Sequence, residues 1–329
     1  MTRLRWGILS TASVNRRLLD AASRSRRGEV VAVASREASR ASEYAARHGI
    51  PRAYGSYQDL LDDPAVDVVY ISVPNSLHIE WTERAVAAGK HVLCEKPLAS
   101  DAERLGRVLE DARRGTLHVT ESLPLRHMPH IVALRELVGS GAVGRVRCAS
   151  TALTYHASRD ANPRFQPQLD GGALLDIGCY CCSALRLCCG HPVRAAAVAT
   201  EADSGVDVAL SGVLAAEWLA QFTVSMDAAT FQYLTIVGED GVVRVPEPYR
   251  STAPRIEVQT RDERRLLEYD CPDPFELEFE NMIDAVLGDR PLVLGPEELV
   301  AQAQVLEALR LSVAEARTVE LTKLNGGRC

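Results

Sequence analysis

The sequence predicts a two-domain α/β protein: a doubly wound domain built on a parallel sheet, followed by an α+β domain with a large, mostly antiparallel open sheet. Strand and helix patterns alternate over the first part of the chain, and the strands there are apolar on both faces, which is typical of a sheet covered by helices on both sides. Long β-rich stretches dominate the rest. At 329 residues the chain exceeds one small core. We assign residues 1–122 to the first domain and residues 123–329 to the second.

The first domain is expected to contain five strands, each an apolar run that ends in small or polar residues. They lie at residues 4–11, 29–36, 66–73, 91–97 and 116–122. Segments with helical spacing of apolar residues separate or flank them, at residues 13–25, 37–49, 56–63, 78–90 and 100–115. Gly49 and Gly89 are suited to end two of these helices, and Ser100 is suited to the N-cap of the last one.

The second domain is expected to open with a helix and turn at residues 129–144. Six β-rich stretches follow, and "GEDG" inside the fifth has the composition of a hairpin turn; the stretches are residues 145–156, 193–202, 206–215, 217–227, 231–245 and 255–270. A helix is expected at residues 171–190, after the first stretch. Two helices, at residues 274–289 and 296–317, come last.

Composition narrows the possible partners and the location. The net charge of −7 argues against a nucleic-acid-binding surface. The arginines near the first helix are therefore expected to be solvated; they are Arg16, Arg17, Arg24, Arg26 and Arg27. No apolar run reaches the ~18–20 residues of a membrane span, and no apolar signal region follows Met1. Nine cysteines in such a chain indicate a reducing, cytoplasmic location.

Five of the cysteines cluster within residues 179–189. Zinc sites usually need thiolates that converge from a turn and a second, distant pair of ligands. Neighbouring residues of a helix point about 100° apart, so adjacent cysteines here cannot face one ion. Buried packing of these small side chains is therefore favoured over metal or redox chemistry, and no metal site is expected.

The turn after the first strand has the place of a phosphate-binding turn but lacks its glycines. Ser10, Ala12 and Asn15 stand where the glycines of G-x-G-x-x-G are expected. A serine can form the turn and offer its hydroxyl to a phosphate, alanine keeps the backbone approachable, and the helix N-terminus still provides free N–H groups. The turn is compatible with a dinucleotide, although a purely structural strand–helix turn would also fit.

The end of the second strand indicates which dinucleotide. NAD sites place Asp or Glu there to hold the ribose hydroxyls, whereas this chain has Ser35 and Arg36. A guanidinium can stack on adenine and hold a 2′-phosphate, so NADP is favoured over NAD. The alternative is that Arg36 is simply an exposed residue that opens a helix.

Two motifs carry the chemistry. Lys96 in "CEKP" follows the fourth strand at the carboxyl edge of the sheet, where such folds bind ligands, and it can stabilise a developing alkoxide. In "GGALLDIGCY", Asp176 and Tyr180 are four residues apart and share a helix face, and glycines at 171 and 172 permit close backbone approach. A tyrosine beside a lysine can give a proton to a carbonyl that accepts hydride. A surface lysine and a half-buried aromatic remain the structural alternatives.

With "AGKHVLCEKPL" (88–98), "PNSLH" (74–78) and "GGALLDIGCY" (171–180), the chain resembles the Gfo/Idh/MocA family over essentially its whole length. Tyr180 resembles the branch with dimeric dihydrodiol dehydrogenase, NADP-dependent xylose dehydrogenase and nucleotide-sugar 3-ketoreductases. The resemblance implies an N-terminal Rossmann domain and a C-terminal sheet that forms a homodimer or homotetramer. It implies catalytic roles for Lys96, Asp176 and Tyr180. The expected cofactor-binding residues are Ser10, Thr11, Ala12, Ser35, Arg36, Pro74, Asn75, His78, Glu95, Lys96 and Arg164.

The expected function is an NADP-dependent oxidoreductase acting on a sugar-like hydroxyl or ketone, with a nucleotide-linked deoxysugar 3-ketoreductase favoured. A free-aldose 1-dehydrogenase or trans-dihydrodiol dehydrogenase is the alternative, and a non-catalytic NADP(H)-binding sensor is a second one. "ESLPLRHMP" departs from the branch pattern: Glu121 and Arg126 persist, but an aromatic residue is absent and Pro124 is extra. This departure suggests a pocket unlike that of the usual aldose enzymes.

Overall fold

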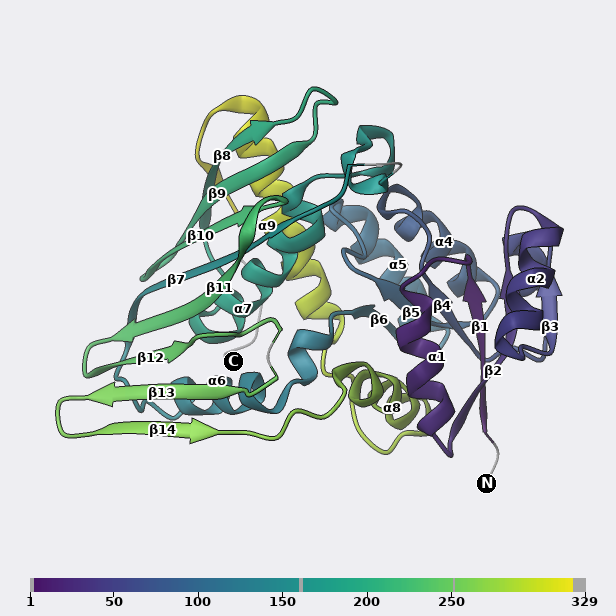
Figure 1. Cartoon of the computed structure of the whole chain (residues 1–329), viewed down its shortest axis with the longest axis horizontal. Helices are drawn as coiled ribbons and strands as arrows, with labels where there is room; N and C mark the ends of the chain where they lie inside the picture. The colour runs from purple at the N-terminus through teal and green to yellow at the C-terminus, as the bar shows by residue number, and fades with distance from the viewer. Residues whose placement is uncertain (1–2, 160–161, 251, 322–329) are drawn as a thin grey trace. The chain divides into compact units, whose positions relative to one another are not determined.

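The computed structural model describes residues 3–159, 162–250 and 252–321, and the chain divides into two compact units (Figure 1). Unit 1 comprises Met1–Pro124 and Pro272–Val300, and unit 2 comprises Leu125–Cys271 and Ala301–Cys329. The chain first passes from unit 1 to unit 2 after Pro124, two residues beyond the boundary expected after residue 122. The expected division needs one amendment, because a segment far along the chain returns to unit 1.

Unit 1 is built on a six-stranded parallel sheet in the order β3-β2-β1-β4-β5-β6, as the sequence predicts for a doubly wound domain. The strands are β1 (Leu4–Leu9), β2 (Gly28–Ala34), β3 (Arg52–Tyr54), β4 (Val68–Ile71), β5 (His91–Glu95) and β6 (Val119–Ser122). The order reverses between β1 and β4, so the carboxyl ends of these strands form the switch point where such sheets bind ligands. The three-residue β3 is too short to give a pattern and was not expected.

The helices of unit 1 lie close to their expected positions, at α1 (Asn15–Arg24), α2 (Ala38–His48), α3 (Tyr57–Leu61), α4 (His78–Ala87) and α5 (Ala102–Arg114). Gly49 and Gly89 have φ of 67° and 73°, a left-handed conformation that suits glycine after a helix. The N-cap of α5 is Asp101 and not Ser100, because the Asp101 carboxylate accepts the Arg104 N–H at 2.8 Å.

Helix α8 (Pro274–Leu287) is the returning segment, and it completes the core of unit 1. Its Phe279 ring stacks on Trp6 of β1, with ring centroids 4.4 Å apart and an angle of 25° between the planes. A Cβ atom at Gly28 would lie 2.7 Å from the Phe279 ring, so only glycine fits at the start of β2. Met282 and Ile283 join the same buried cluster.

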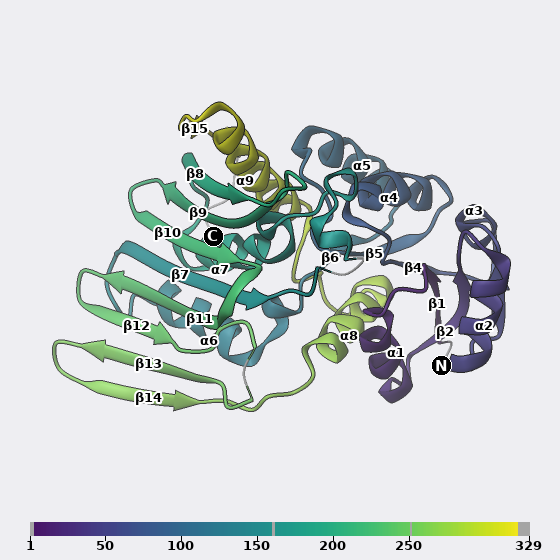
Figure 2. The ribbon, with the colours of Figure 1, turned by 45° about the horizontal axis from the view of Figure 1, so that its top comes forward.

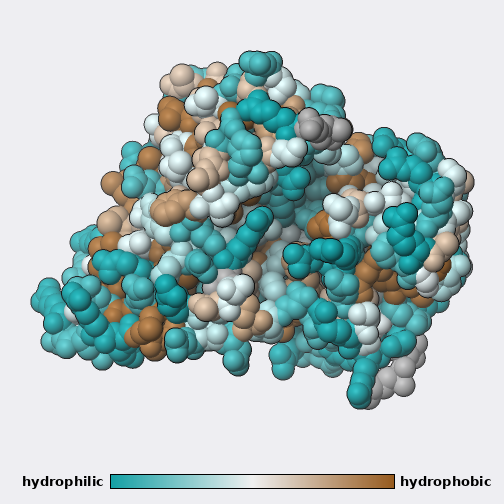
Figure 3. Space-filling model, in the orientation of Figure 1, coloured by the Kyte–Doolittle hydropathy of each residue, from teal (hydrophilic) through white to brown (hydrophobic). Residues whose placement is uncertain are grey.

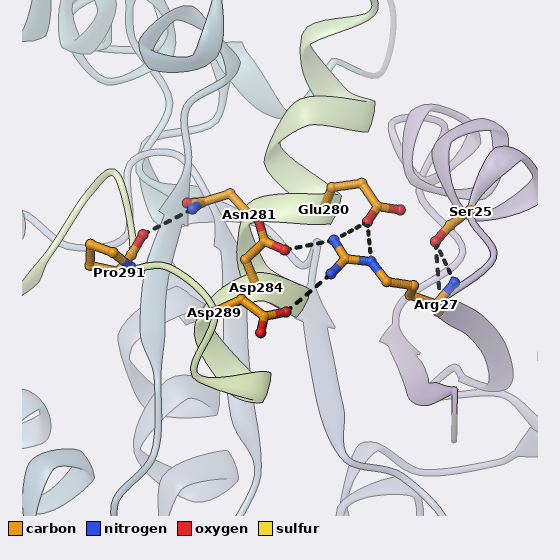
Figure 4. Close-up of polar contacts among 8 residues, drawn as sticks. Ser25, Arg27, Glu280, Asn281, Asp284, Asp289 and Pro291 are labelled. Atoms are coloured by element: carbon orange, nitrogen blue, oxygen red, sulfur yellow. Dashed lines mark hydrogen bonds and ion pairs between the residues drawn. The ribbon is translucent and has the colours of Figure 1, made fainter. Parts of the chain in front are cut away.

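Two arginines between β1 and β2 form ion pairs with α8 and the residues that flank it, and Figure 4 shows those of Arg27. The Arg27 guanidinium lies 2.6 Å from carboxylate oxygens of both Glu280 and Asp284, and 3.4 Å from Asp289. Arg24 pairs with Asp273 and Glu276 of the same segment. Two of the arginines expected on a solvated surface thus have structural partners. Each exposed pair contributes modestly to stability.

Unit 2 contains a nine-stranded sheet in the order β14-β13-β12-β11-β7-β10-β9-β8-β15, in which only the β7/β10 pair is parallel among the described residues. The strands are β7 (Val146–His156), β8 (Arg194–Glu201), β9 (Asp207–Ala215), β10 (Leu219–Ser225), β11 (Asp227–Gly238), β12 (Gly241–Val245), β13 (Arg255–Thr260), β14 (Arg264–Glu268) and β15 (Val319–Glu320). The β11–β12 hairpin confirms the turn predicted from "GEDG". The predicted fold class is confirmed for both sheets.

Helices α6 (Pro129–Gly139), α7 (Cys179–Cys189) and the later part of α9 (Pro296–Glu315) lie along one face of this sheet (Figure 2). The other face exposes apolar side chains, including Val198 at 72%, Leu219 at 59% and Phe231 at 56% of their full exposure. Residues 171–190 do not form one regular helix as expected: a π-helical turn over Leu174–Gly178 precedes α7.

One described helical stretch, Pro167–Cys189, has the length and apolar composition of a membrane span, which the sequence reading did not anticipate. Of its most apolar window, 78% is buried inside the protein, as in a core helix. In the face drawn in Figure 3, apolar residues are scattered among hydrophilic ones.

Replacing Phe279 by Ala should lower the free energy of unfolding by about 3–5 kcal/mol, because the change removes the stack on Trp6 and leaves a cavity beside Gly28. Leu287→Ala, at a half-exposed position of the same helix, is the control and should cost far less. Urea unfolding followed by tryptophan fluorescence measures both. Equal losses in the two variants would contradict a core role for Phe279.

Candidate functional site

The turn between β1 and α1 is held by side chains in place of glycines. Ser10 has φ of 114°, a conformation that normally requires glycine. Its Oγ lies 2.9 Å from both the carbonyl oxygen and the Oγ of Ser72, and it accepts the Ala12 N–H at 3.1 Å. Asn15 is fully buried; its Nδ2 donates to the Ser10 carbonyl at 2.9 Å, and its Oδ1 accepts from Ser72 at 2.5 Å. These hydrogen bonds therefore hold the backbone of the turn in the absence of the fingerprint glycines.

These contacts revise the role expected for Ser10. Its hydroxyl is buried and engaged with the turn, so it shapes the site instead of presenting a donor to a phosphate. Thr11 and Ala12 are half-buried at the end of β1. Helix α1 begins at Asn15, three residues after Ala12, and has no acidic residue in its first turn, so its N-terminus can accept an anion without repulsion. The residues present fit the diphosphate of a dinucleotide.

The tip of β2 carries a cation. Ser35 is buried, and its N–H donates to the Tyr54 carbonyl at 3.1 Å, which fixes the backbone just before Arg36. Arg36 is exposed, and the structure pairs it with no carboxylate among the described residues. Its charge and that of Arg40 act on nearby Tyr57, whose pKa is nevertheless raised by burial. A guanidinium in this place fits an external phosphate.

The segment after β5 places Lys96 at the carboxyl edge of the sheet, followed by a cis peptide bond to Pro97. Tyr70 donates to Glu95 Oε1 at 2.5 Å, and the Lys96 N–H donates to Glu95 Oε2 at 3.3 Å. Buried His78 has Nδ1 at 2.8 Å from the Pro97 carbonyl oxygen and Nε2 at 2.8 Å from that of Val73. These contacts join His78 to the Lys96–Pro97 turn, and its contact with a cofactor stays a prediction.

Pro74 and Asn75 lie half-buried after β4, at the same carboxyl edge, where the 3₁₀ turn Asn75–Leu77 begins. Their contact with a cofactor stays a prediction.

Buried carboxyl groups lie behind this edge. Glu278 of α8 accepts from Ser122 Oγ at 2.7 Å, and Glu121 Oε1 accepts the Leu98 N–H at 2.7 Å. Burial raises the pKa of Glu278 well above its ordinary value, and the charges of Glu95 and Glu121 raise it further. Burial beside these two carboxyl groups therefore favours the neutral form of Glu278.

In unit 2 the π-helical turn presents Asp176, whose side chain is held by two neighbours. Tyr155 of β7 donates to Asp176 Oδ2 at 2.6 Å, and Arg164 Nε lies 2.9 Å from the same oxygen. The sequence assigns Arg164 to the cofactor, whereas the structure pairs it with Asp176. Tyr180 lies at the start of α7, half-buried, with its ring edge-on to Tyr249 at 6.3 Å between centroids. π-helical turns are frequent at functional sites.

The cysteine cluster lies in the core. Cys179, Cys181, Cys182 and Cys188 are buried and Cys189 is partly buried. Burial raises the pKa of Cys181 and of Cys188 to about 12, so both are thiols at neutral pH. Within the described ranges, no group of three or more His, Cys, Asp or Glu residues is arranged to hold a metal ion.

Sequence reasoning missed three residues of these networks. Ser72 reaches Ser10 through the pairing of β1 with β4, Tyr155 reaches Asp176 from β7, and Asp207 of β9 binds the start of the π-helical turn. The polar Ser72 at the end of an apolar strand was the one available signal. Arg126 of the departing "ESLPLRHMP" segment is buried, with Nη1 at 3.2 Å from Ser183 Oγ.

Fold and geometry together define a dinucleotide-binding α/β protein with a second, sheet-based domain. Two family models match the chain: an oxidoreductase family with an NAD-binding Rossmann fold over residues 4–121, and a GFO/IDH/MocA C-terminal domain over residues 131–244. The chain therefore belongs to the Gfo/Idh/MocA family of oxidoreductases, and its first unit has an NAD(P)-binding Rossmann fold.

Relatives with different substrates are similar to the chain. "D-xylose 1-dehydrogenase (NADP(+)) 2" of Haloferax volcanii is 35% identical over 96% of this chain and 99% of its own length. A dTDP-3,4-didehydro-2,6-dideoxy-alpha-D-glucose 3-reductase of Streptomyces violaceoruber is 36% identical over 80% of each.

The 3-ketoreductase KijD10 of Actinomadura kijaniata, solved with NADP and TDP-benzene, superposes with a TM-score of 0.88 at 29% identity, covering 95% of this chain and 98% of its own. Further KijD10 structures carry a Tyr→Phe or a Lys→Ala replacement, at positions as far apart as Lys96 and Tyr180 are here.

Substitutions at Ser10 should separate backbone strain from hydrogen bonding. Ser10→Ala and Ser10→Gly both lose the Oγ contacts, but glycine relieves the left-handed φ, so we expect the glycine variant to be about 1–2 kcal/mol more stable than the alanine variant. Ser23, exposed within α1, is the matched control: there glycine should be the less stable by about 1 kcal/mol. Chemical denaturation measures all four. The same order at both sites would disprove strain at Ser10.

Proposed function

We propose that this protein is an NADP-dependent oxidoreductase that reduces the 3-keto group of a nucleotide-linked deoxysugar. The observation that carries the proposal is the pair Lys96 and Tyr180, which are separated along the chain as are the lysine and tyrosine replaced in KijD10. The overall likeness to KijD10, which binds NADP and TDP-benzene, supports a nucleotide-linked substrate.

The proposal gives each residue a role. NADPH, when bound, supplies the hydride to the sugar carbon. Tyr180 gives its phenolic proton to the carbonyl oxygen, and the Lys96 ammonium stabilises the charge that develops on that oxygen. Asp176, fixed by Tyr155 and Arg164, orients the substrate or the neighbouring catalytic groups. The same residues serve the reverse reaction, since proton and hydride then move in the opposite direction.

The cofactor is held by the turn at Ser10–Ala12, the α1 N-terminus and Arg36. Arg36 is exposed and forms no ion pair with a carboxylate of the described residues, which favours a 2′-phosphate, so NADP is proposed in preference to NAD. Thr11, Pro74, Asn75 and Glu95 complete the proposed set at the carboxyl edge of the sheet.

A free-aldose 1-dehydrogenase is the second candidate, favoured by the nearly full-length similarity to the Haloferax xylose dehydrogenase. A panel decides between them: a thymidine-diphosphate 3-keto-deoxysugar with NADPH, D-xylose and D-glucose with NADP, and a trans-dihydrodiol with NADP. We expect kcat/KM to be highest for the keto-sugar. Preference for a free aldose or the dihydrodiol would replace the proposed substrate, and cofactor binding with no turnover of any compound would point to a sensor.

The proposed location is the cytoplasm, where NADP-dependent reduction and free thiols are both sustained. We also propose a homodimer or homotetramer formed through the open face of the unit 2 sheet, because that face exposes Val198, Leu219 and Phe231.

Lys96→Ala and Tyr180→Phe should each lower kcat by roughly 10²–10⁴-fold, because one removes the charge partner and the other the proton donor. The Kd for NADPH, measured by fluorescence titration, should change little. Tyr269→Phe, in the segment after β14, is the control and should leave kcat unchanged. Near-normal turnover by the Tyr180→Phe enzyme would remove Tyr180 from the mechanism.

Cofactor preference should depend on Arg36. A charged contact is worth about 1.5–3 kcal/mol, so wild-type kcat/KM should favour NADP over NAD by roughly 10–100-fold. Arg36→Asp should erase or reverse the preference, because attraction is replaced by repulsion. Arg47→Asp, at the other end of α2, should retain it. Equal use of both cofactors by the wild type would show Arg36 to be a solvated helix residue.

The oligomer should depend on the open face of the sheet. Val198→Glu places a charge among apolar side chains and should shift the mass measured by light scattering toward the monomer. Val293→Glu, at a partly exposed position in unit 1, should not. A wild-type protein that is already monomeric at micromolar concentration would contradict the proposed assembly.

A further inference from the structure

The start of the helical segment that carries Asp176 and Tyr180 rests on a carboxylate from another element. Asp207, the first residue of β9, accepts the Leu174 N–H through Oδ2 at 2.7 Å. The backbone of Ala173 also hydrogen-bonds to this carboxylate. Two of the N–H groups that a helix start leaves without intrahelical partners are therefore satisfied by one distant side chain.

The glycines of "GGALLDIGCY" are explained by the same contact. Gly172 has φ of 115°, and a Cβ atom there would lie 2.0 Å from Asp207 Oδ1. A Cβ atom at Gly171 would lie 2.4 Å from the Arg164 carbonyl oxygen, which itself accepts the Gly172 N–H at 2.9 Å. Both glycines thus admit protein atoms, and the closest approach is to the Asp207 carboxylate.

The residues that Asp207 binds are followed, in the same helical segment, by Asp176 and Tyr180. The Asp176 N–H donates to the Gly172 carbonyl at 3.0 Å, so Asp176 lies one turn beyond the residues that Asp207 binds. Tyr180 follows directly after the π-helical turn, at the start of α7. A shift of residues 172–174 would be transmitted along this rigid segment to both side chains.

Burial of the Asp207 carboxyl group disfavours its charged form. Burial raises the pKa of Asp207 to about 6, and the hydrogen bonds from Leu174 and Ala173 and the charge of Arg310 only partly offset this effect. At neutral pH the group is nevertheless a carboxylate, the form that accepts two N–H groups most strongly. A charge retained at such a cost is commonly connected with function.

We propose that Asp207 is a positioning residue of the reaction, which fixes Asp176 and Tyr180 by binding the first N–H groups of the π-helical turn. This inference rests on the function proposed above for Tyr180. Asp207 need not touch substrate or cofactor for this role.

The test compares Asp207→Ala, Asp207→Asn and the control Asp203→Asn, a change in the exposed turn before β9. Asp207→Ala should lower kcat roughly 10–100-fold, because misplacement by about 1 Å can cost that much. Asp207→Asn keeps one acceptor oxygen and should recover most of the loss. The Kd for NADPH and the activity of Asp203→Asn should stay within twofold of the wild type.

Hydrogen exchange of the amides at residues 173–180 gives a readout independent of turnover. It should be faster in Asp207→Ala and near wild type in Asp207→Asn. Unchanged exchange and unchanged kcat in the alanine variant would overturn the inference. If that variant does not fold, Gly172→Ala takes its place, because a Cβ atom there would lie 2.0 Å from Asp207 Oδ1. Unchanged exchange at residues 173–180 together with unchanged kcat in folded Gly172→Ala would then overturn the inference. If the wild type reduces no keto-sugar, the proposed function fails, while the exchange result still decides whether Asp207 holds the turn.

Discussion

The left-handed conformation at residue 10 is the constraint on which the proposed cofactor site depends. The chain must leave β1 and enter α1 so that the helix N-terminus faces the carboxyl edge of the sheet. With Ser10 at φ of 114° and no glycine, the strain is balanced by the hydrogen bonds that join Ser10, Asn15 and Ser72. Residues that depart from the fingerprint thus keep its backbone, and they also tie β1 to β4 at the point where the strand order reverses.

Much of the fold could be predicted because local patterns determine it. Strands apolar on both faces, separated by segments with helical spacing, predicted the parallel sheet, and long β-rich stretches predicted the antiparallel one. The return of α8 to unit 1 could not be predicted, because it depends on contacts between residues far apart in the chain, such as the Trp6–Phe279 stack and the ion pairs of Arg27. The short β3 has no local signal, and the π-helical turn at Leu174–Gly178 arises from tertiary contacts at its start.

For the candidate site, the sequence identified the residue types and their positions, but it could not predict the hydrogen-bond partners of these side chains. Lys96, Asp176 and Tyr180 lie on the predicted elements, and Arg36 is exposed at the predicted strand tip. The structure gives Ser10, His78 and Arg164 protein partners that are distant in the chain, namely Ser72, Pro97 and Asp176, and their contacts with a cofactor stay a prediction. A motif shows which side chains are present, but only the fold shows whether they face a ligand or one another.

The discontinuity of unit 1 has a consequence for synthesis on the ribosome. Residues through Pro124 emerge long before Pro272–Val300, so the β1 face around Trp6 and the close-fitting position at Gly28 stay uncovered while unit 2 is being made. Strict domain-by-domain folding from the N-terminus is therefore impossible for this chain. The nascent protein exposes an apolar surface to chaperones or to itself until α8 arrives, and a fragment that stops at Pro124 lacks part of its own core.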